Sequence, residues 1–384
     1  MIQMPVEPQV TDYLHRKAAA KGIPLNGTFE LTPCCNMACR MCYVRMTEQE
    51  RRAAGELISA KDWLTLAEQA REKGMLYLLL TGGEPFLRRD IREIIEGLHQ
   101  MGFVLTMNTN ATLIDETVME WLVKVPPTRM NITLYGASDA TYERLCGNPR
   151  GFTQATHAIR LLKEAGINIK INCSVTPYNK EDLEELFEYC RREGLNWQPT
   201  SYMFPPLRRD EDSIGINDRF SPEEAAYYSA KLEALNYGKE RYIAMVEGRG
   251  ELPAPPMDDC LDTDAEGTGI SCRVGRCCFW VTWQGIIMPC GMFPSSYGTQ
   301  LRIGSESGVS FAEAWDTIHS QAMAIRLPAK CSSCELKGIC HPCAAMCVTE
   351  TGHFDRVPEY RCQMSQAYRD QCRILAEELK NQKE

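Results

Sequence analysis

Apolar and polar residues follow two alternating patterns along the chain. Short apolar runs typical of buried strands are separated by stretches whose apolar residues recur every three or four positions, as on one face of a helix. The predicted strands are FELT (29–32), YLLLT (77–81), VLTMNT (104–109), NITLYG (131–136), IKINCSV (169–175) and QPTSYMF (198–204), and the clearest helices are 61–74, 155–166 and 180–194. This alternation predicts an α/β protein whose parallel sheet is joined by right-handed crossovers.

The 384 residues are 44% hydrophobic, so the chain can bury a large core and divide into domains. Twelve of its 19 cysteines lie after residue 259, which marks a second domain. The proline-rich segment RGELPAPPMDDC (249–260) predicts the boundary. The expected domains are an N-terminal segment (1–26), an α/β domain (27–220), a helical linker (221–259) and a cysteine-rich domain (260–384).

The cysteines are expected to be reduced. The first twenty residues lack a secretion signal, and the longest apolar run, Met75–Leu80, is too short to cross a bilayer, so we expect a cytoplasmic protein without a membrane anchor. Cytosolic reductants disfavour disulfides, which leaves metal or cluster binding. The formal net charge of −9 argues against nucleic acid as a partner.

The stretch CCNMACRMCY (34–43) places Cys35, Cys39 and Cys42 in a C-x3-C-x2-C motif. No fourth ligand follows at a distance that would close a local zinc site, and three thiolates suit a four-iron cluster with one open iron. A zinc site that recruits Cys34 is the alternative. It is disfavoured because adjacent residues of a strand point to opposite sides.

This motif resembles the cluster motif of the radical S-adenosylmethionine (SAM) superfamily. The resemblance implies a partial (β/α)6 TIM-like barrel, with a 4Fe-4S cluster on the three cysteines and SAM on the open iron. An electron from a flavodoxin or ferredoxin would cleave SAM to a 5′-deoxyadenosyl radical, which abstracts hydrogen from the substrate. The chain departs from the family at Met41, where an aromatic residue is usual, and Tyr43 follows the motif instead.

Further residues at strand ends resemble the SAM-binding positions of that family. LLLTGGEPFLR contains Gly82, Gly83 and Glu84 in a GGEP motif, which receives the amino group of SAM. Thr133 stands where the family usually has a serine, and Asn108 ends the preceding strand. Sites in such barrels gather at the carboxyl ends of the strands, so these residues are expected to converge.

The C-terminal cysteines resemble the SPASM extension, which holds two auxiliary 4Fe-4S clusters and would bring the total to three. The resemblance implies one cluster on Cys331, Cys334, Cys340 and Cys362. The other would use Cys272, Cys278, Cys290 and Cys343, with Cys277 as the alternative to Cys278 and Cys347 as the alternative to Cys343. A pair of structural zinc sites is the alternative, since C-x2-C spacing also serves zinc.

Enzymes with this arrangement are mainly peptide and protein maturases, which cross-link, epimerise or oxidise their substrates or form thioethers. The expected function is therefore a radical SAM oxidoreductase acting on a peptide or protein. A small-molecule dehydrogenase and a non-catalytic electron carrier are the alternatives. About 26 residues precede the first strand, too few for a recognition domain, so a leader peptide would need a separate recognition protein. Cys146 is the candidate catalytic thiol for hydrogen donation.

Overall fold

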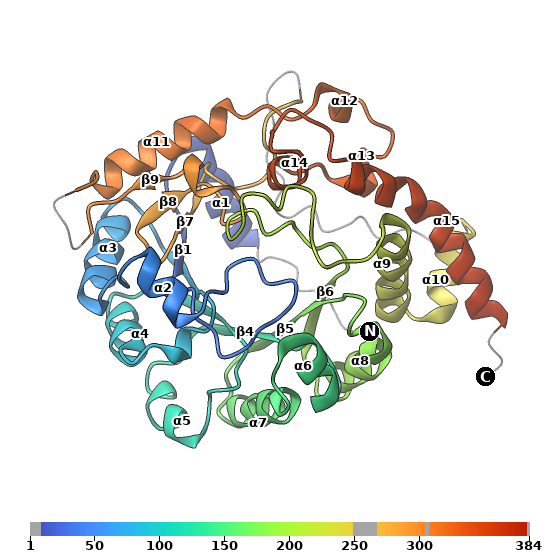
Figure 1. The fold of residues 1–384 in the computed structure, drawn as a ribbon, viewed down its shortest axis with the longest axis horizontal. Coiled ribbons are helices and arrows are strands. Elements are labelled where there is room, and N and C mark those ends of the chain that lie inside the picture. The colour runs from blue at the N-terminus through green and yellow to red at the C-terminus, as the bar shows by residue number, and fades with distance from the viewer. Residues whose placement is uncertain (1–8, 249–266, 304–306, 382–384) are drawn as a thin grey trace.

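One sheet organises the molecule (Figure 1). In the computed structural model, which describes residues 9–248, 267–303 and 307–381, its strand order is β6-β5-β4-β3-β2-β1-β7-β8-β9. The strands are β1 (Asn26–Glu30), β2 (Tyr77–Thr81), β3 (Val104–Thr109), β4 (Arg129–Thr133), β5 (Ile169–Ser174), β6 (Asn196–Thr200), β7 (Cys278–Val281), β8 (Ile286–Met288) and β9 (Thr299–Gln300).

Strands β1 to β6 pair in parallel and in chain order, with helices outside, so the predicted partial α/β barrel is confirmed. All six predicted strands are present, displaced by at most a few residues. The first helices are α1 (Gln9–Lys21), α2 (Glu48–Ala54), α3 (Ala60–Glu72), the 3-10 turn η1 (Pro85–Leu87), α4 (Ile91–Gln100), α5 (Glu116–Leu122), α6 (Asp139–Cys146), α7 (Gly151–Glu164), the 3-10 turn η2 (Lys180–Asp182) and α8 (Leu183–Arg192).

The barrel helices form because their apolar residues recur at helical spacing. In α4 the buried residues are Ile91, Ile94, Ile95 and Leu98, which share one face of the helix. This face belongs to the main core together with outward residues of the strands, such as Leu78 and Leu80 of β2. The barrel core therefore lies between the sheet and the outer helices.

The opposite, inward face of the sheet is polar. Alternate residues of each strand point inward, and from β3 to β6 these include Thr106, Asn108, Asn131, Thr133, Asn172, Ser174, Gln198 and Thr200. Gln198 and Thr200 are exposed although they lie within a strand, and most of the others are half-buried. The inward face of the sheet is thus polar and partly exposed, unlike the apolar face that packs on the helices, and we call the side of the sheet that it faces the lumen.

The C-terminal region continues the barrel sheet. Strand β7 pairs in parallel with β1, with Asn26 opposite Cys278, and β7 and β8 form an antiparallel hairpin whose turn contains Gly285 at φ +80°. The remaining helices are α9 (Pro222–Tyr237), α10 (Lys239–Val246), the 3-10 turn η3 (Ser295–Tyr297), α11 (Phe311–Ala324), α12 (Ala329–Ser332), α13 (Lys337–Cys340), α14 (Ala344–Thr351) and α15 (Glu359–Asn381).

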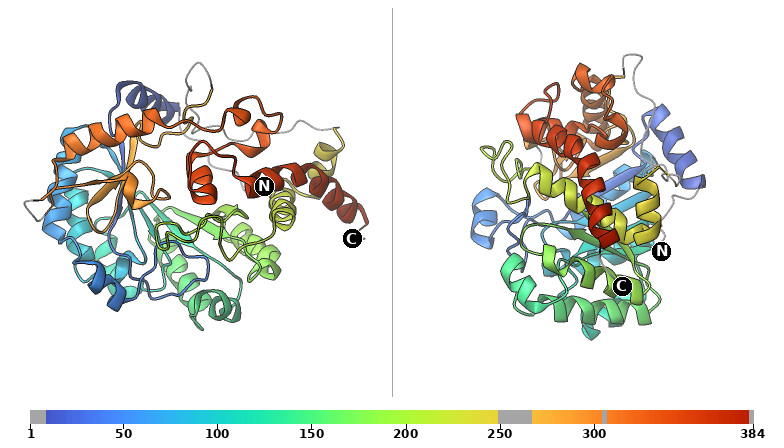
Figure 2. Two further views of the ribbon diagram at one scale, coloured as in Figure 1. Left: turned by 45° about the horizontal axis from the view of Figure 1, so that its top comes forward. Right: turned by 90° about the vertical axis from the view of Figure 1, so that its right-hand side faces the viewer.

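Helix α15 packs along α9 and α10, so the last described helix contacts the predicted linker (Figure 2). Helix α9 begins at a capping box in which the Ser221 side chain and Glu224 bond to each other's backbone N–H, with Pro222 at the first turn. The predicted boundary segment 249–260 lies outside the described residues.

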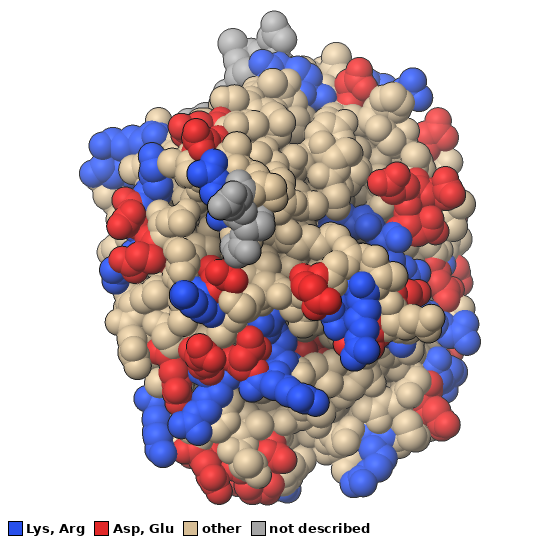
Figure 3. Space-filling view, turned by 60° about the vertical axis from the view of Figure 1, so that its left-hand side comes forward, with Lys and Arg blue, Asp and Glu red and all other residues tan. Residues whose placement is uncertain are grey.

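The surface seen in Figure 3 mixes basic and acidic side chains without a stripe of one sign. Among the described residues, no helix is long and apolar enough to cross a membrane.

Candidate functional site

The two loops that follow β1 and β2 are held against each other by backbone contacts. Gly83 N–H donates to the carbonyl of Thr32 at 2.7 Å, and Glu84 N–H donates to the carbonyl of Cys34 at 2.9 Å. A Cβ built on Gly83 would lie 2.2 Å from the Cys34 oxygen, so only glycine permits this approach. The GGEP turn therefore fixes the start of the cysteine loop at the carboxyl ends of the strands.

Within that loop, Cys35, Cys39 and Cys42 are close enough to act electrostatically on one another. Burial raises the pKa of Cys35 to about 12, and the neighbouring Cys39 and Cys42 add to this effect. The sulfur of Cys35 accepts a hydrogen bond from Met37 N–H at 3.4 Å, and that of Cys42 accepts one from Arg45 N–H at 3.3 Å. Partly buried sulfurs that face backbone donors fit the requirements of iron–sulfur ligands.

Glu84 is fully buried and its carboxylate is occupied. One oxygen accepts hydrogen bonds from Phe86 N–H at 3.0 Å and from the Thr109 hydroxyl at 2.8 Å, and the other accepts one from Asn110 N–H at 2.8 Å. Burial raises the pKa of Glu84 to about 7. The side chain thus joins η1 to the end of β3, and both of its oxygens are engaged by donors of the protein.

Asn108 and Thr133 both lie on the lumen face, as the strand-end argument predicts. Asn108 donates to the Thr81 hydroxyl at 3.4 Å and accepts from the Asn131 amide at 2.9 Å. The structure adds Asn110, whose amide donates to Asn36 at 2.9 Å and to the sulfur of Cys35 at 3.6 Å. The contact between Asn110 and Cys35 joins segments 75 residues apart, so no local sequence signal indicates it.

Cys146 is the last residue of α6 and is fully buried. Its carbonyl accepts a hydrogen bond from Ala38 N–H at 2.7 Å. A hydrogen bond between the Cys39 and Cys146 thiols is the main cause that raises the pKa of Cys39, followed by burial. Cys146 therefore packs against the cysteine loop at the end of a helix, and its predicted role as hydrogen donor stays a prediction.

Four partly buried C-terminal thiols form a second group, made up of Cys272, Cys278, Cys290 and Cys343. Burial raises the pKa of Cys272 and of Cys290 to about 12, and in both cases Cys343 adds to the effect. Cys278 also interacts with Cys272, whereas Cys277 is packed in an apolar cluster beneath α1. These contacts favour Cys278 over Cys277 and Cys343 over Cys347.

The third group lies among the short helices α12 and α13 and the start of α15, and consists of Cys331, Cys334, Cys340 and Cys362. Burial is the main cause that raises the pKa of Cys331, and the other three thiols contribute. All four side chains are only partly buried. The described residues contain no set of three or more His, Cys, Asp or Glu side chains arranged to hold a single metal ion.

The family is decided by comparison. A model of the radical SAM superfamily matches residues 29–190. These residues belong to the radical SAM superfamily. This radical SAM protein is 25% identical over 335 residues to the AdoMet-dependent heme synthase of Oleidesulfovibrio alaskensis, a match that spans 84% of this chain and 83% of that protein.

Solved structures share the fold of this radical SAM enzyme. The chain matches anSMEcpe, solved with AdoMet and the Cp18Cys peptide, with a TM-score of 0.66 and 16% identity over 93% of this chain and 99% of that one. It matches Streptococcus suis SuiB bound to the precursor peptide SuiA with a TM-score of 0.62 and 20% identity over 91% and 79% of the two chains. At these identities the likeness concerns the fold alone.

The sequence patterns do not predict one buried ion pair of this radical SAM enzyme. The Arg208 guanidinium donates to both carboxylate oxygens of Glu30, at 2.7 and 2.8 Å, and to the carbonyl of Gly291 at 2.8 Å. Tyr43 lies beside this pair, and its pKa is raised by burial, by Glu30 and, to smaller extents, by Cys42 and Cys290. The pair thus links β1 to the loop that carries Cys290, next to the first cysteine loop.

Proposed function

We propose that this radical SAM enzyme is an oxidoreductase that modifies a peptide or protein held in its barrel lumen. Cys35, Cys39 and Cys42 would hold the 4Fe-4S cluster. The backbone of Gly82, Gly83 and Glu84, with Asn108 and Thr133, would hold SAM. When bound, the cluster and SAM supply a 5′-deoxyadenosyl radical that abstracts hydrogen from carbon.

The chain's own residues position and protect that chemistry. Glu84 fixes the relation of the GGEP turn to the end of β3, and Asn110 donates to Cys35. Asn108 and Asn131 form a hydrogen-bonded row across the lumen face, which would orient polar groups of the substrate. The outer helices close the apolar side of the sheet, so access to the site is from the lumen.

The openness of the lumen is the observation that carries the peptide proposal. Gln198 and Thr200 face inward and remain exposed, so the barrel is not closed around a small cavity on the β6 side. An extended peptide can enter such a space and leave it again, whereas small ligands are usually enclosed. The peptide-bound neighbours anSMEcpe and SuiB have the same fold.

The auxiliary clusters are part of the proposal. Cys272, Cys278, Cys290 and Cys343 would hold one 4Fe-4S cluster, and Cys331, Cys334, Cys340 and Cys362 the other. A cluster with four thiolate ligands has no open iron, so both would serve electron transfer or structure. A flavodoxin or ferredoxin would supply the electron, and a separate protein would recognise a leader peptide. We also propose that residues 27–220 and 260–384 form the two domains of the chain.

A small-molecule reaction is the second candidate, because matches that span most of both proteins are heme synthases. The Methanosarcina barkeri AdoMet-dependent heme synthase is 26% identical over 85% of this chain and 93% of its own length. Such coverage is longer than the barrel alone and reaches into the C-terminal region, so overall architecture does not separate the two candidates.

The test begins with anaerobic reconstitution. About twelve iron atoms per chain are expected for three four-iron clusters, and dithionite should drive formation of 5′-deoxyadenosine. Peptides encoded beside the gene and haem precursors are then added separately, and each product is sought by mass spectrometry. Product from a peptide supports the proposal, and product from a haem precursor alone supports the second candidate. Zinc in place of iron, or no cleavage of SAM, would contradict both.

A further inference from the structure

Two basic residues share the lumen face at the amino-terminal end of the barrel. Arg129 is the first residue of β4, and Lys170 is the second residue of β5, paired with Asn131 of β4. Arg129 and Asn131 are two positions apart and therefore point to the same side. Both cations lie on the polar face formed by Asn131, Asn172 and Gln198, away from the core.

The two cations have only neutral partners. Arg129 donates through Nε to the Asn131 side-chain oxygen at 3.0 Å, and Lys170 donates to the Gln198 side-chain oxygen at 2.6 Å. In the described part of the chain, neither forms an ion pair, and the terminal nitrogens of Arg129 have no acceptor. Other buried arginines differ, since each is paired with a carboxylate: Arg208 with Glu30, Arg219 with Glu350 and Arg88 with Asp90.

This arrangement is costly for the free protein. Both side chains are half-buried, and burial lowers the pKa of Lys170 to about 8, with the charge of Arg129 contributing to the shift. Like charges on adjacent strands repel each other, and partial burial removes the water that would screen them. An anion between them would relieve both effects, and a guanidinium fork beside an ammonium matches a carboxylate.

We propose that Arg129 and Lys170 form an anion subsite in the lumen that binds a carboxylate of the substrate. This proposal rests on the proposed function, which places the substrate there. Thr133 lies four residues beyond Arg129 on β4, about 13 Å along the strand. The subsite would therefore hold the substrate at a point remote from the SAM end. An acidic residue of a peptide or one end of a small dicarboxylic acid would supply the carboxylate.

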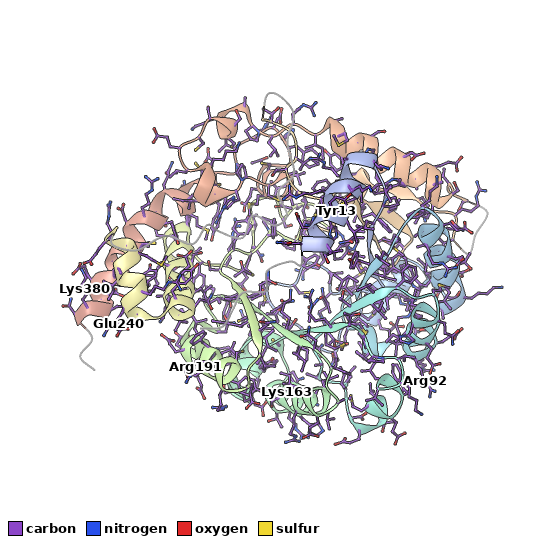
Figure 4. All side chains as sticks on the ribbon, turned by 180° about the vertical axis from the view of Figure 1, so that it is seen from behind. Tyr13, Arg92, Lys163, Arg191, Glu240 and Lys380 are labelled. Carbon is purple, nitrogen blue, oxygen red and sulfur yellow. The ribbon has the colours of Figure 1, made fainter. Side chains whose placement is uncertain are left out.

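Selective acetylation of Lys170 tests the subsite without any radical chemistry. The full-length, cluster-loaded protein is treated with limiting N-hydroxysuccinimidyl acetate at pH 7.5, and labelling rates are read by peptide mass spectrometry. A lysine with a lowered pKa reacts readily at this pH. Saturating glutarate should slow labelling of Lys170 at least tenfold and leave Lys163, on the outside of the helical ring (Figure 4), unchanged.

The variant Arg129→Gln should reduce glutarate protection to less than twofold. Arg129→Lys keeps the positive charge and should retain part of the glutarate protection of Lys170. This variant keeps the test decisive if the glutamine variant folds poorly. Arg92→Gln, on the outer surface (Figure 4), is the matched control. In this variant glutarate should protect Lys170 as strongly as in the wild type. Absence of protection in the wild type, or equal protection in Arg129→Gln, would overturn the subsite.

Further probes identify the source of the anion. Protection by pyrophosphate but not by glutarate would replace the carboxylate with a phosphate and overturn the proposal. Tighter protection by N-acetyl-Ala-Glu-Glu-Ala-amide than by glutarate supports a peptide carboxylate, and the reverse order supports a small acid. Because labelling needs no SAM cleavage, its failure alongside normal 5′-deoxyadenosine formation would reject only the subsite.

Discussion

The first cysteine loop and the third thiol group use similar residues in different surroundings. The loop of Cys35 is fixed by backbone hydrogen bonds to the GGEP turn and by Asn110, which directly follows β3. In the third group, Cys331 and Cys340 lie on helices of only four residues, and the thiols are partly buried like those of the first loop. The barrel therefore fixes the first loop through several strands, whereas the third group depends mainly on its own short segments and the start of α15.

Cysteine spacing alone therefore does not indicate how strongly the surrounding strands and helices constrain a cysteine group. The second thiol group is intermediate, because Cys278 belongs to a strand that pairs with β1 and Cys290 precedes the glycine bound by Arg208. Substitutions should therefore have effects that decline from the barrel loop outward.

The largest effect is expected from Cys39→Ala. Loss of one of the three cluster ligands should reduce 5′-deoxyadenosine formation by about a thousandfold or more, because no side chain can replace the radical chemistry that the cofactor supplies. Iron content should fall by about four per chain. Cys190→Ala, a buried cysteine of α8 outside the three groups, is the control and should retain activity. Normal turnover by the Cys39 variant would contradict the cluster assignment.

Cys334→Ala should separate cleavage of SAM from product formation. The first loop shares none of the ligands of the third group, so 5′-deoxyadenosine should still form, while product falls below detection. Both quantities are measured in one anaerobic assay by chromatography. If product forms at the normal rate, the third group has no role in turnover, and the comparison of the two regions loses its functional meaning.

Arg208→Met tests the connection between the barrel and the second group. It leaves the buried Glu30 carboxylate without its partner, which should cost about 3–5 kcal/mol of unfolding free energy. The measurement is the midpoint of anaerobic urea unfolding. Arg209→Met is the control, and its exposed side chain should matter by about 1 kcal/mol or less. A double variant with Glu30→Leu should recover part of the loss, and an additive loss would contradict the ion-pair explanation.

Glu84→Gln should remove a pH dependence of stability. Burial raises the pKa of Glu84 from 4.5 to about 7, so the folded state binds a proton more tightly than the unfolded state. Stability should therefore fall as pH rises from about 4.5 to 7, by about 3 kcal/mol at most. The glutamine variant should lose this slope, whatever its overall stability. An unchanged slope would assign the dependence to other groups.

Local patterns predicted the barrel well. Strands β1 to β6 follow from apolar runs, and the bounds shift because pairing with neighbours decides where a strand ends. The last predicted strand, 198–204, is observed as Asn196–Thr200, since the chain leaves the sheet after its partner β5 ends at Ser174.

The site was predictable to the extent that it depends on residue spacing. Motifs placed Cys35, the GGEP turn, Asn108 and Thr133 at one edge of the sheet. The Glu30–Arg208 pair joins residues 178 positions apart, and no local signal indicates it. The buried state of the Glu84 carboxylate depends likewise on tertiary contacts with β3.

The pairing of β7 with β1 has a consequence for the order of folding. Strand β1 is complete early in synthesis, but its second neighbour begins at Cys278, about 250 residues later. Until then one edge of β1 carries unpaired backbone groups, which can template association with another chain. Such a distant partner makes folding slow and exposes intermediates to aggregation. Fragments that end before β7 should therefore be poor material for isolating the barrel.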